Sequence, residues 1–419
     1  MLASEPVASA NKAATNHDRR HLRVVLYSSG VVGLGHMRRS LLVAEAMSKS
    51  PLQPVILMLA DARQAGSFAM PTSMDCITLP ALMKHPDGTF LPRYLSLSTA
   101  SVIHMRSQML LSIISSYRPD ILVVDNVPRG VLGELQSVLA NLRESSDTRV
   151  VLGMRDVLDD PDAVKREWAK LNNQSFIVHN YDEVWVYGDR TLNDVVSEYD
   201  FCADLAAKIR YTGYLDQCER LHGDDEIERA ELHSLGLSPG CYNLCLVGGG
   251  QDGASVAHAF AAASMPTGQQ GLVVAGPFMP DSQRLELHKI AARNRGMKVL
   301  DFANEPTILL KHARSVVAMG GYNTTMEVLS FEKRALLIPR VMPRSEQMVR
   351  AERLRDMGLV SVLHPASLTS GAITAWLNGP MANRQRSRHV LDMGGVPRIA
   401  QFLQTPLPRS ASHCALSLI

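Results

Sequence analysis

The stretch SVVAMGGYNTTME, residues 315–327, decides how this chain folds. It opens with a short, mostly apolar run at 315–319, passes through Gly320 and Gly321, and reaches Asn323, a residue type favoured at the N-cap of a helix. A short apolar run without polar alternation is typical of a parallel strand covered on both faces. The stretch therefore predicts a buried strand, a sharp glycine turn and a helix, which together make the repeating unit of an α/β sheet.

The same unit recurs on both sides of residue 240. Apolar runs predict five strands in each half, at residues 22–27, 54–60, 121–124, 149–152 and 183–187, then 243–247, 271–275, 297–300, 315–319 and 335–339. Helical patterns separate them, at residues 38–48, 100–116, 130–142, 161–171, 253–263, 283–293 and 323–331. Ligands bind at the carboxyl edge of such sheets. The sequence thus predicts an α/β fold of two tandem Rossmann-like domains that face each other across a cleft.

The polar segment between the two series sets the expected domain boundaries. We expect a disordered arm at 1–21, an acceptor domain at 22–215, a linker at 216–240, a nucleotide-binding domain at 241–395, and a final helix and tail at 396–419. A helical pattern at 396–403 is expected to cross back onto the first domain.

Composition narrows the class of protein. A hydrophobic content of 46% with 20% charged residues is typical of a globular chain, and a net charge of +2 gives no bulk attraction to nucleic acid. The polar start does not resemble a signal peptide, and no apolar run is long enough to span a membrane. Six scattered cysteines lack zinc spacing and indicate reduced thiols. We expect a cytoplasmic protein with at most peripheral contact at the inner face of the membrane.

A second glycine-rich turn follows the predicted strand at 243–247. It holds four glycines in six positions and opens a helix, an arrangement that fits a phosphate-binding turn better than a stable element; its candidate donor ligands are Gly248, Gly249, Gly250, Gln251 and Gly253. The Lys-Ser/Thr pair of a nucleotide-hydrolysing P-loop is missing. A merely flexible connection between strand and helix is the competing interpretation.

The turn at 320–327 and the segment after the last strand carry further polar groups. Thr324 and Thr325 offer hydroxyls to an anion, and Glu327 stands where its carboxylate could accept the hydroxyls of a ribose. An acidic residue in a first helical turn is also favourable through the helix dipole alone. Three polar residues beyond the strand at 335–339 could contact a sugar or simply face solvent: Arg344, Glu346 and Gln347.

The N-terminal glycine turn contains Gly33 and Gly35 and is followed at once by His36. It is not the dinucleotide fingerprint, so His36 is either a base at the carboxyl edge of the sheet or an exposed helix cap. Asp125 and Asp156 follow two further strands and are the second and third candidates for the base. Residues 80–110 predict an acceptor loop, whose Leu82, Met83, Phe90, Leu91 and Leu95 we interpret as core contacts rather than as a lipid-binding surface.

Together these motifs resemble the GT-B glycosyltransferases, and most of all the family-28 group. The resemblance covers about residues 22–365 and is strongest at 316–353. It implies that the glycine turns, Asn323 and Thr324 lie by the donor diphosphate, and that Glu327 holds the ribose. It further implies that Glu346 and Gln347 contact the sugar, that Phe302 lies beside the base, and that His36 is the catalytic base. The chain departs from the family pattern at Asp252 and at Asp216-Gln217.

The predicted function is transfer of a hexose or N-acetylhexosamine from a nucleotide-diphosphate sugar, presumed from the resemblance to carry uridine, to an acceptor hydroxyl. We expect inversion at the anomeric carbon, no metal, and no cofactor beyond the nucleotide-sugar co-substrate. The acceptor is open and is either lipid-linked or a small molecule. Two alternatives remain at this stage: a nucleotide-sugar 2-epimerase, and a non-catalytic nucleotide-sugar-binding protein.

Overall fold

The fold is described here from a computed structural model of the chain. It describes residues 21–405 except 29–34, 63–64, 66–67, 86–87, 220, 222–224, 304 and 381–384. The expected disordered arm, apart from its last residue, lies outside the described residues, as do Gly33 and the tail from residue 406 onward.

The N-terminal half forms a seven-stranded parallel sheet with the order β3-β2-β1-β6-β7-β8-β9. The strands are β1 (Arg23–Ser28), β2 (Val55–Ala60), β3 (Met74–Thr78), β6 (Ile121–Asp125), β7 (Arg149–Arg155), β8 (Glu183–Tyr187) and β9 (Ile209–Tyr211). Every residue of β6 and β8 is buried, as expected for central strands covered on both faces. The carboxyl ends of β1, β6 and β7 therefore meet at one edge of this sheet.

The C-terminal half forms a second parallel sheet of six strands with the order β12-β11-β10-β13-β14-β15. Its strands are β10 (Tyr242–Leu246), β11 (Gln270–Val274), β12 (Met297–Leu300), β13 (Ser315–Ala318), β14 (Arg334–Leu337) and β15 (Ser361–Val362). In both sheets the order reverses beside the first strand of the half, which is where ligands bind in open α/β sheets. The structure thus has the two tandem Rossmann-like units that the sequence predicts.

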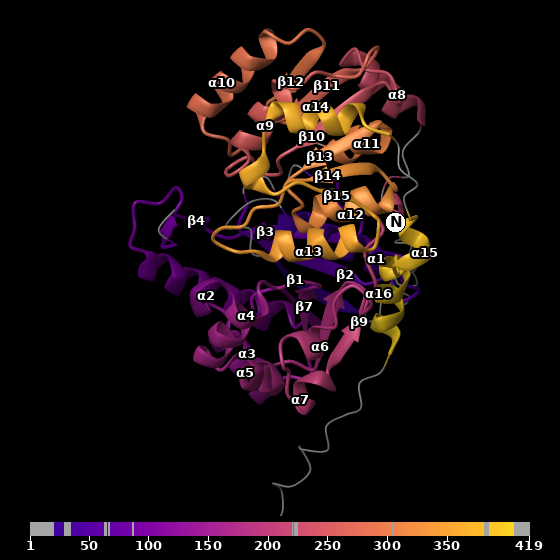
Figure 1. The fold of residues 1–419 in the computed structure, drawn as a ribbon. Coiled ribbons are helices and arrows are strands. Elements are labelled where there is room, and N and C mark those ends of the chain that lie inside the picture. The colour runs from indigo at the N-terminus through magenta and orange to yellow at the C-terminus, as the bar shows by residue number, and fades with distance from the viewer. Residues whose placement is uncertain are drawn as a thin grey trace, which may run out of the picture.

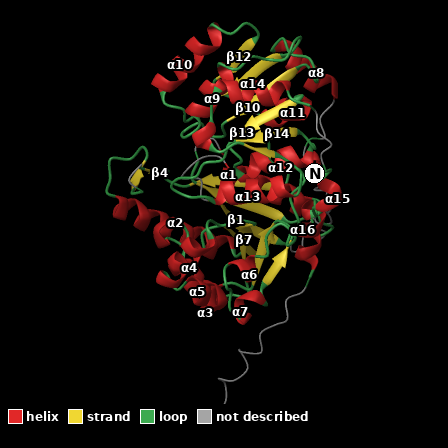
Figure 2. Cartoon of the chain, viewed as in Figure 1, coloured by secondary structure: helices red, strands yellow, loops and turns green. Residues whose placement is uncertain are grey.

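Helices cover both faces of each sheet (Figure 2). The helices of the N-terminal half are α1 (Gly35–Ser48), α2 (Thr99–Tyr117), α3 (Gln136–Ser145), α4 (Pro161–Lys170), α5 (Asn173–Asn180), α6 (Val195–Glu198) and α7 (Ala203–Ala206). Those that follow are α8 (Asp225–Ser234), α9 (Ala254–Ala261), α10 (Asp281–Ala292), α11 (Pro306–His312), α12 (Tyr322–Ser330), α13 (Glu346–Asp356), α14 (Ser370–Asn378), α15 (Ser387–Val390) and α16 (Gly395–Gln404).

One hydrophobic core runs through both halves. Alternate residues of β1 and β10 enter it, Val24 and Leu26 from the first sheet and Leu244 and Leu246 from the second. The final helix α16 closes this core by returning to the N-terminal half, where Phe402 lies against Trp185 with ring centroids 5.5 Å apart. Figure 1 shows α16 beside the N-terminal sheet, while α12 and α13 lie between the two halves.

Two segments differ from the sequence-based expectation. The helix expected at 130–142 is replaced by a short 3-10 turn and by α3, because Gly130 and Gly133 adopt positive φ values of 69° and 85° that a continuous helix does not allow. The expected linker at 216–240 contains α8, which belongs to the C-terminal core because its Leu232 is completely buried there. Hydrophobic burial outweighs the acidic composition of that segment.

The expected acceptor loop contains a hairpin and the first half of α2. The strands β4 (Leu82–Lys84) and β5 (Phe90–Pro92) pair in antiparallel fashion, and Figure 1 shows them extending away from the rest of the N-terminal half. Leu82 is buried, but Leu91 and Leu95 are each 43% exposed, so the expectation of core contacts is wrong for these two leucines.

Candidate functional site

The turn after β10 requires glycine for steric reasons. Gly250 has a φ of 87°, and a β-carbon there would lie 2.2 Å from the carbonyl oxygen of Ala275. Gly276 is equally confined, because its β-carbon would lie 2.4 Å from the carbonyl oxygen of Gly248. Two backbone segments thus touch directly at the carboxyl edge of the sheet, and α9 begins just beyond Gly253. Within this turn Gly248, Gln251 and Asp252 are exposed at the edge, whereas Gly250 and Gly253 are buried.

Asp252, at which the sequence departs from the family pattern, pairs across this edge with Arg340. The Nη1 atom of Arg340 lies 2.7 Å from Oδ2 of Asp252. Arg340 follows β14, and its backbone N–H donates to Oε1 of Gln347 at 3.0 Å. Gln347, expected to contact a sugar, therefore uses one amide oxygen to hold this backbone, and sequence reasoning did not single out Arg340.

The turn after β13 joins the two halves of the molecule. Gly320 has a φ of 73°, and α12 begins at Tyr322 with Gly321 as its N-cap. Asn323 is therefore inside the first turn of the helix, and its expected role as the N-cap is wrong. Its side-chain amide instead donates to the carbonyl oxygen of Gly35 at 2.7 Å, in the N-terminal half. The hydrogen bond brings the expected diphosphate turn next to the residue that precedes His36.

The threonines and Glu327 of this motif are more buried than a simple ligand contact would suggest. Thr324 is half-buried, and the fully buried hydroxyl of Thr325 has no hydrogen-bond partner within the described residues. Glu327 is 4% exposed and accepts a hydrogen bond from the hydroxyl of Thr307 at 2.9 Å. Its carboxylate thus faces the first turn of α11. Phe302, 43% exposed, precedes that helix. The ribose and base contacts stay predictions.

His36 and Asp125 meet at the carboxyl edge of the N-terminal sheet. The Nδ1 atom of His36 lies 2.7 Å from Oδ2 of Asp125, although the residues are 89 positions apart in sequence. Nη2 of Arg39 also lies 3.0 Å from this Nδ1 atom. In the tautomer whose Nδ1 donates its proton to the carboxylate, Nε2 of His36 is the proton acceptor. The His36 side chain is 27% exposed, whereas that of Asp125 is 5% exposed. The pair has the geometry of a base oriented by a buried carboxylate.

Arg39 completes this group and was missed by sequence reasoning. Its Nε and Nη2 atoms donate to the two carboxylate oxygens of Asp125 at 2.9 and 2.8 Å. Burial alone would raise the pKa of Asp125, but Arg39 and His36 outweigh it and hold that pKa at about 2. Asp125 is therefore ionised at neutral pH. The only sequence signal was the position of Arg39 one helical turn after His36.

Asp156, the third candidate for the base, is enclosed. It has no exposed surface, Nε and Nη2 of the buried Arg350 donate to it at 2.8–3.1 Å, and the Tyr214 hydroxyl donates to it at 2.8 Å. A carboxylate held this way cannot reach a substrate, and its oxygens already accept hydrogen bonds from these donors. Its geometry argues for a role in joining α13 to the N-terminal half rather than for catalysis.

The sugar-side candidates also join the halves. Glu346 is 5% exposed and pairs with Arg155 of β7 at 2.6 Å, and the Ser345 backbone N–H donates to Asp159 at 2.7 Å. Arg344 lies 3.2 Å from the exposed Glu167 of α4. These side chains therefore lie where the C-terminal half contacts the N-terminal half, and each is paired across that contact.

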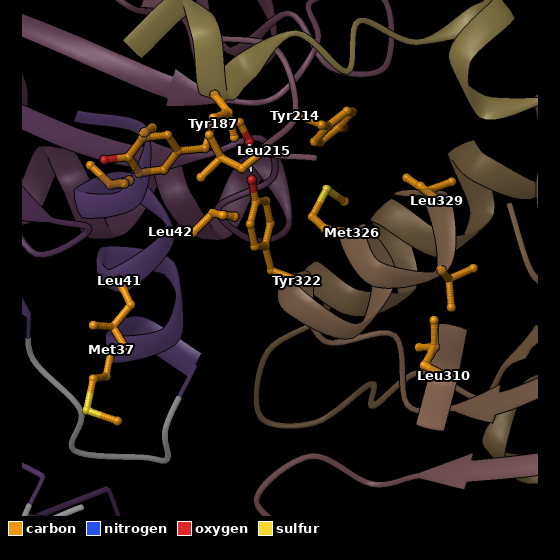
Figure 3. Close-up of a cluster of buried hydrophobic side chains, with 14 of the residues drawn as sticks. Met37, Leu41, Leu42, Tyr187, Tyr214, Leu215, Leu310, Tyr322, Met326 and Leu329 are labelled. Atoms are coloured by element: carbon orange, nitrogen blue, oxygen red, sulfur yellow. Dashed lines mark hydrogen bonds between the residues drawn. The ribbon is translucent and has the colours of Figure 1, made fainter. Parts of the chain in front are cut away.

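Tyr322 occupies the centre of the contact between the halves. Its hydroxyl donates to the backbone carbonyl oxygen of Tyr187 at 2.7 Å, and Figure 3 shows the two residues side by side. The guanidinium carbons of Arg39 and Arg350 lie 5.2 and 5.4 Å from its ring centroid, within the range of cation–π attraction. Through Arg39, Tyr322 thus links the His36–Asp125 pair to α12, the helix that follows the glycine turn at 320–321.

No metal site accompanies these groups in the part of the chain that the structure describes. No three His, Cys, Asp or Glu side chains gather there as metal ligands would. Asp160, the first residue of the Asp160-Pro161-Asp162 string, caps α4 by accepting from the Ala163 backbone N–H at 3.0 Å. Within the same described residues, no helix combines the length and apolarity needed to cross a membrane.

Comparison with known proteins identifies the architecture. No family model and no curated protein matches the sequence. Among solved structures, the glycotransferase of kitacinnamycin superposes with a TM-score of 0.60 at 15% identity, covering 93% of this chain and 100% of that one. The chain has the GT-B fold. MurG of Acinetobacter baumannii superposes with a TM-score of 0.53 at 15% identity over 91% of this chain and 99% of its own.

An epimerase shares the fold as well. The UDP-GlcNAc 2-epimerase of Methanocaldococcus jannaschii superposes with a TM-score of 0.56 at 12% identity, covering 91% of this chain and 99% of that one. The GT-B fold therefore accommodates more than one reaction, and the activity of this chain has to be argued from its own site.

Proposed function

We propose that this protein is a glycosyltransferase that moves a sugar from a nucleotide-diphosphate donor to an acceptor hydroxyl. One observation carries the proposal: Gly35, next to the oriented base His36, is hydrogen-bonded to Asn323 of the glycine turn expected to bind the diphosphate. The contact brings a proton acceptor and an anion-binding edge together across the two halves. Transfer of a sugar requires these two components, an activated nucleophile and a stabilised leaving group.

In the proposed reaction, Nε2 of His36 takes the proton of the acceptor hydroxyl. The acceptor oxygen forms a bond to the anomeric carbon while the bond from that carbon to the diphosphate oxygen breaks. The nucleoside diphosphate leaves with the electron pair, and its charge is met by backbone N–H groups at the two C-terminal glycine turns. A single displacement of this kind inverts the anomeric carbon and needs no metal.

We assign the donor as a hexose or N-acetylhexosamine carried by uridine diphosphate, on the strength of the family-28 resemblance. The acceptor enters from the side of the N-terminal half and is a lipid-linked or small molecule; no nucleic acid takes part. The exposed residues Leu91, Tyr94, Leu95 and Leu97 after β4 give that side an apolar surface. The protein then works in the cytoplasm, with any membrane contact peripheral.

Thermal-shift measurements against uridine, thymidine and guanosine diphosphates and their sugars test the donor assignment. A ligand present at 100 times its Kd stabilises the folded state by about 2.7 kcal/mol, which raises the Tm measurably. The expected result is a shift with one diphosphate and a larger one with a matching sugar nucleotide. No shift with any of them would overturn the assignment.

A 2-epimerase is the second candidate, because the structural similarity includes the M. jannaschii UDP-GlcNAc 2-epimerase. An epimerase converts the nucleotide sugar without an acceptor, whereas a transferase releases the nucleoside diphosphate only when an acceptor or water receives the sugar. Incubation with the donor alone, followed by chromatography of the sugar nucleotides, separates the two. A new sugar nucleotide of unchanged mass would establish the epimerase and reject the transferase.

A further inference from the structure

Arg340 stands at the glycine turn where the proposed function places the donor diphosphate. It lies three residues beyond the end of β14, at the carboxyl edge of the sheet, and pairs with Asp252 inside the turn 248–253 at 2.7 Å. Both side chains reach solvent, with 24% of Arg340 and 47% of Asp252 exposed. A ligand from solvent can therefore meet this pair without unfolding any element.

The guanidinium of Arg340 has hydrogen-bonding capacity that the chain does not use. Its backbone is fixed by Gln347, and its Nη1 atom is paired with Asp252, but its buried Nε atom has no hydrogen-bond partner within the described residues. An arginine presents five N–H donors in a planar fork that matches phosphate oxygens. A buried donor without a partner is costly unless a ligand or water supplies the acceptor.

Three arginines near this position act on Glu346, and each of them is paired with a carboxylate. Burial alone would raise the pKa of the neighbouring Glu346, but Arg155, Arg350 and Arg340 together hold that pKa below its usual value. Arg155 and Arg350 carry a buried N–H without a partner as well, at Nε and Nη1 respectively. Each arginine thus keeps a donor for a further acceptor, and the accessible member of the three that lies at the glycine turn is Arg340.

We propose that Arg340 binds the donor diphosphate, and that Asp252 occupies its guanidinium only while the diphosphate is absent. The inference rests on the proposed function. The Asp252 carboxylate satisfies the arginine in the empty site and repels an incoming diphosphate. When the sugar–phosphate bond breaks, charge develops on the leaving diphosphate, and a preorganised arginine beside it stabilises that charge without a metal.

Two substitutions distinguish this role from a structural ion pair. Arg340→Gln removes the cation, so the affinity for uridine diphosphate is expected to fall about tenfold or more. Asp252→Asn removes the competing anion but keeps the shape, so the affinity is expected to rise about threefold. The double variant is expected to behave like Arg340→Gln. Affinity for uridine, which lacks phosphate, is expected to stay the same in all variants.

The matched control is Arg190→Gln, which removes an equally charged arginine paired with Asp194 at 2.8 Å on the outer surface of the N-terminal half. Calorimetric titration with uridine diphosphate gives the affinities, and Tm without ligand reports folding. Weaker binding in both single variants would mark the pair as structural and overturn the proposal. So would an unchanged affinity in Arg340→Gln while the wild type binds. If the wild type binds no nucleoside diphosphate, the proposed function fails too.

Discussion

The two carboxyl edges that face each other in this molecule differ in the chemical groups that form them. The N-terminal edge presents charged side chains held in buried pairs, such as Asp125 with Arg39 of the same half and Asp156 with Arg350 of α13. The C-terminal edge consists of glycine backbone packed against backbone, as at Gly250. Proton transfer needs a titratable side chain in a fixed orientation, whereas binding of a diphosphate needs many N–H groups and little bulk. Under the proposed function, the N-terminal edge is therefore the catalytic edge and the C-terminal edge is the binding edge.

The largest effect is expected from His36→Ala, which removes the base and leaves the glycine turns untouched. General-base catalysis contributes about 10²–10⁴-fold, so the transfer rate kcat is expected to fall by about 10³-fold. Nucleotide affinity, measured by titration, is expected to stay within about twofold. His179→Ala is the control, because His179 is exposed and its ring contacts only its own helix. Near-full activity in His36→Ala would show that the N-terminal edge does not supply the catalytic base.

The second-largest effect is expected from Asp125→Asn, which removes the carboxylate that orients His36 and pairs with Arg39. Loss of the carboxylate leaves His36 without its orienting acceptor, and kcat is expected to fall about 100-fold. It also leaves the buried guanidinium of Arg39 without its partner, which costs about 3–5 kcal/mol of the free energy of unfolding. Urea unfolding followed by circular dichroism measures this cost. A stable variant with full activity would contradict the assigned role of the pair.

The stabilising contribution of the Asp125 carboxylate is expected to fall at low pH. The pKa of Asp125 is lowered in the folded protein to about 2, so its stabilising contribution is complete above its unfolded pKa near 3.8 and is lost as pH falls through about 2. The difference in unfolding free energy between wild type and Asp125→Asn is expected to narrow by about 2 kcal/mol between pH 5 and pH 2. A constant difference would mean that Asp125 is not selectively stabilised in its ionised form.

The binding edge is tested by Gly250→Ala, with Gly268→Ala as a matched control. Both glycines have positive φ, 87° and 74°, so alanine introduces similar backbone strain in each. Only at Gly250 does the new β-carbon meet a backbone atom, because nothing lies within 4 Å of the position at Gly268. Gly250→Ala is expected to lose about 1–3 kcal/mol more stability than the control and to bind nucleoside diphosphate about tenfold more weakly. Equal behaviour of the two variants would reject the steric argument.

The two edges also differ in how far the sequence predicts them. The glycine turns are local, because a strand, a turn and a helix follow one another within residues 315–327. The sequence alone therefore predicts the motif. The partnership of His36 with Asp125 spans 89 positions and depends on which strands become neighbours in the sheet. The hydrophobic periodicity of the sequence does not predict strand order. Asp125 could therefore be proposed only as an alternative to His36 and not as its partner.

The same reason explains what sequence reasoning missed. Four arginines belong to no recognisable sequence motif, and the role of each depends on a carboxylate far away in the chain. They are Arg39, Arg155, Arg340 and Arg350. Asp156 illustrates the opposite error: a carboxylate at the end of a strand resembles a base until its burial against Arg350 is seen. The fold class and the glycine turns followed from local patterns, while the contacts of the charged residues required the packing of one half on the other.

The smallest effect is expected at the contact where the edges meet, in Asn323→Ala. The amide of Asn323 donates to the Gly35 carbonyl at 2.7 Å in an exposed position, so its loss costs about 0.5–1.5 kcal/mol. Because this bond aligns the base with the donor turn, we expect kcat to fall about three- to tenfold while nucleotide affinity is nearly unchanged. Asn378→Ala is the control, since the Asn378 amide donates at 2.9 Å within its own helix. If Asn323→Ala weakened nucleotide binding and left kcat intact, Asn323 would belong to the binding edge alone, and the two edges would act independently.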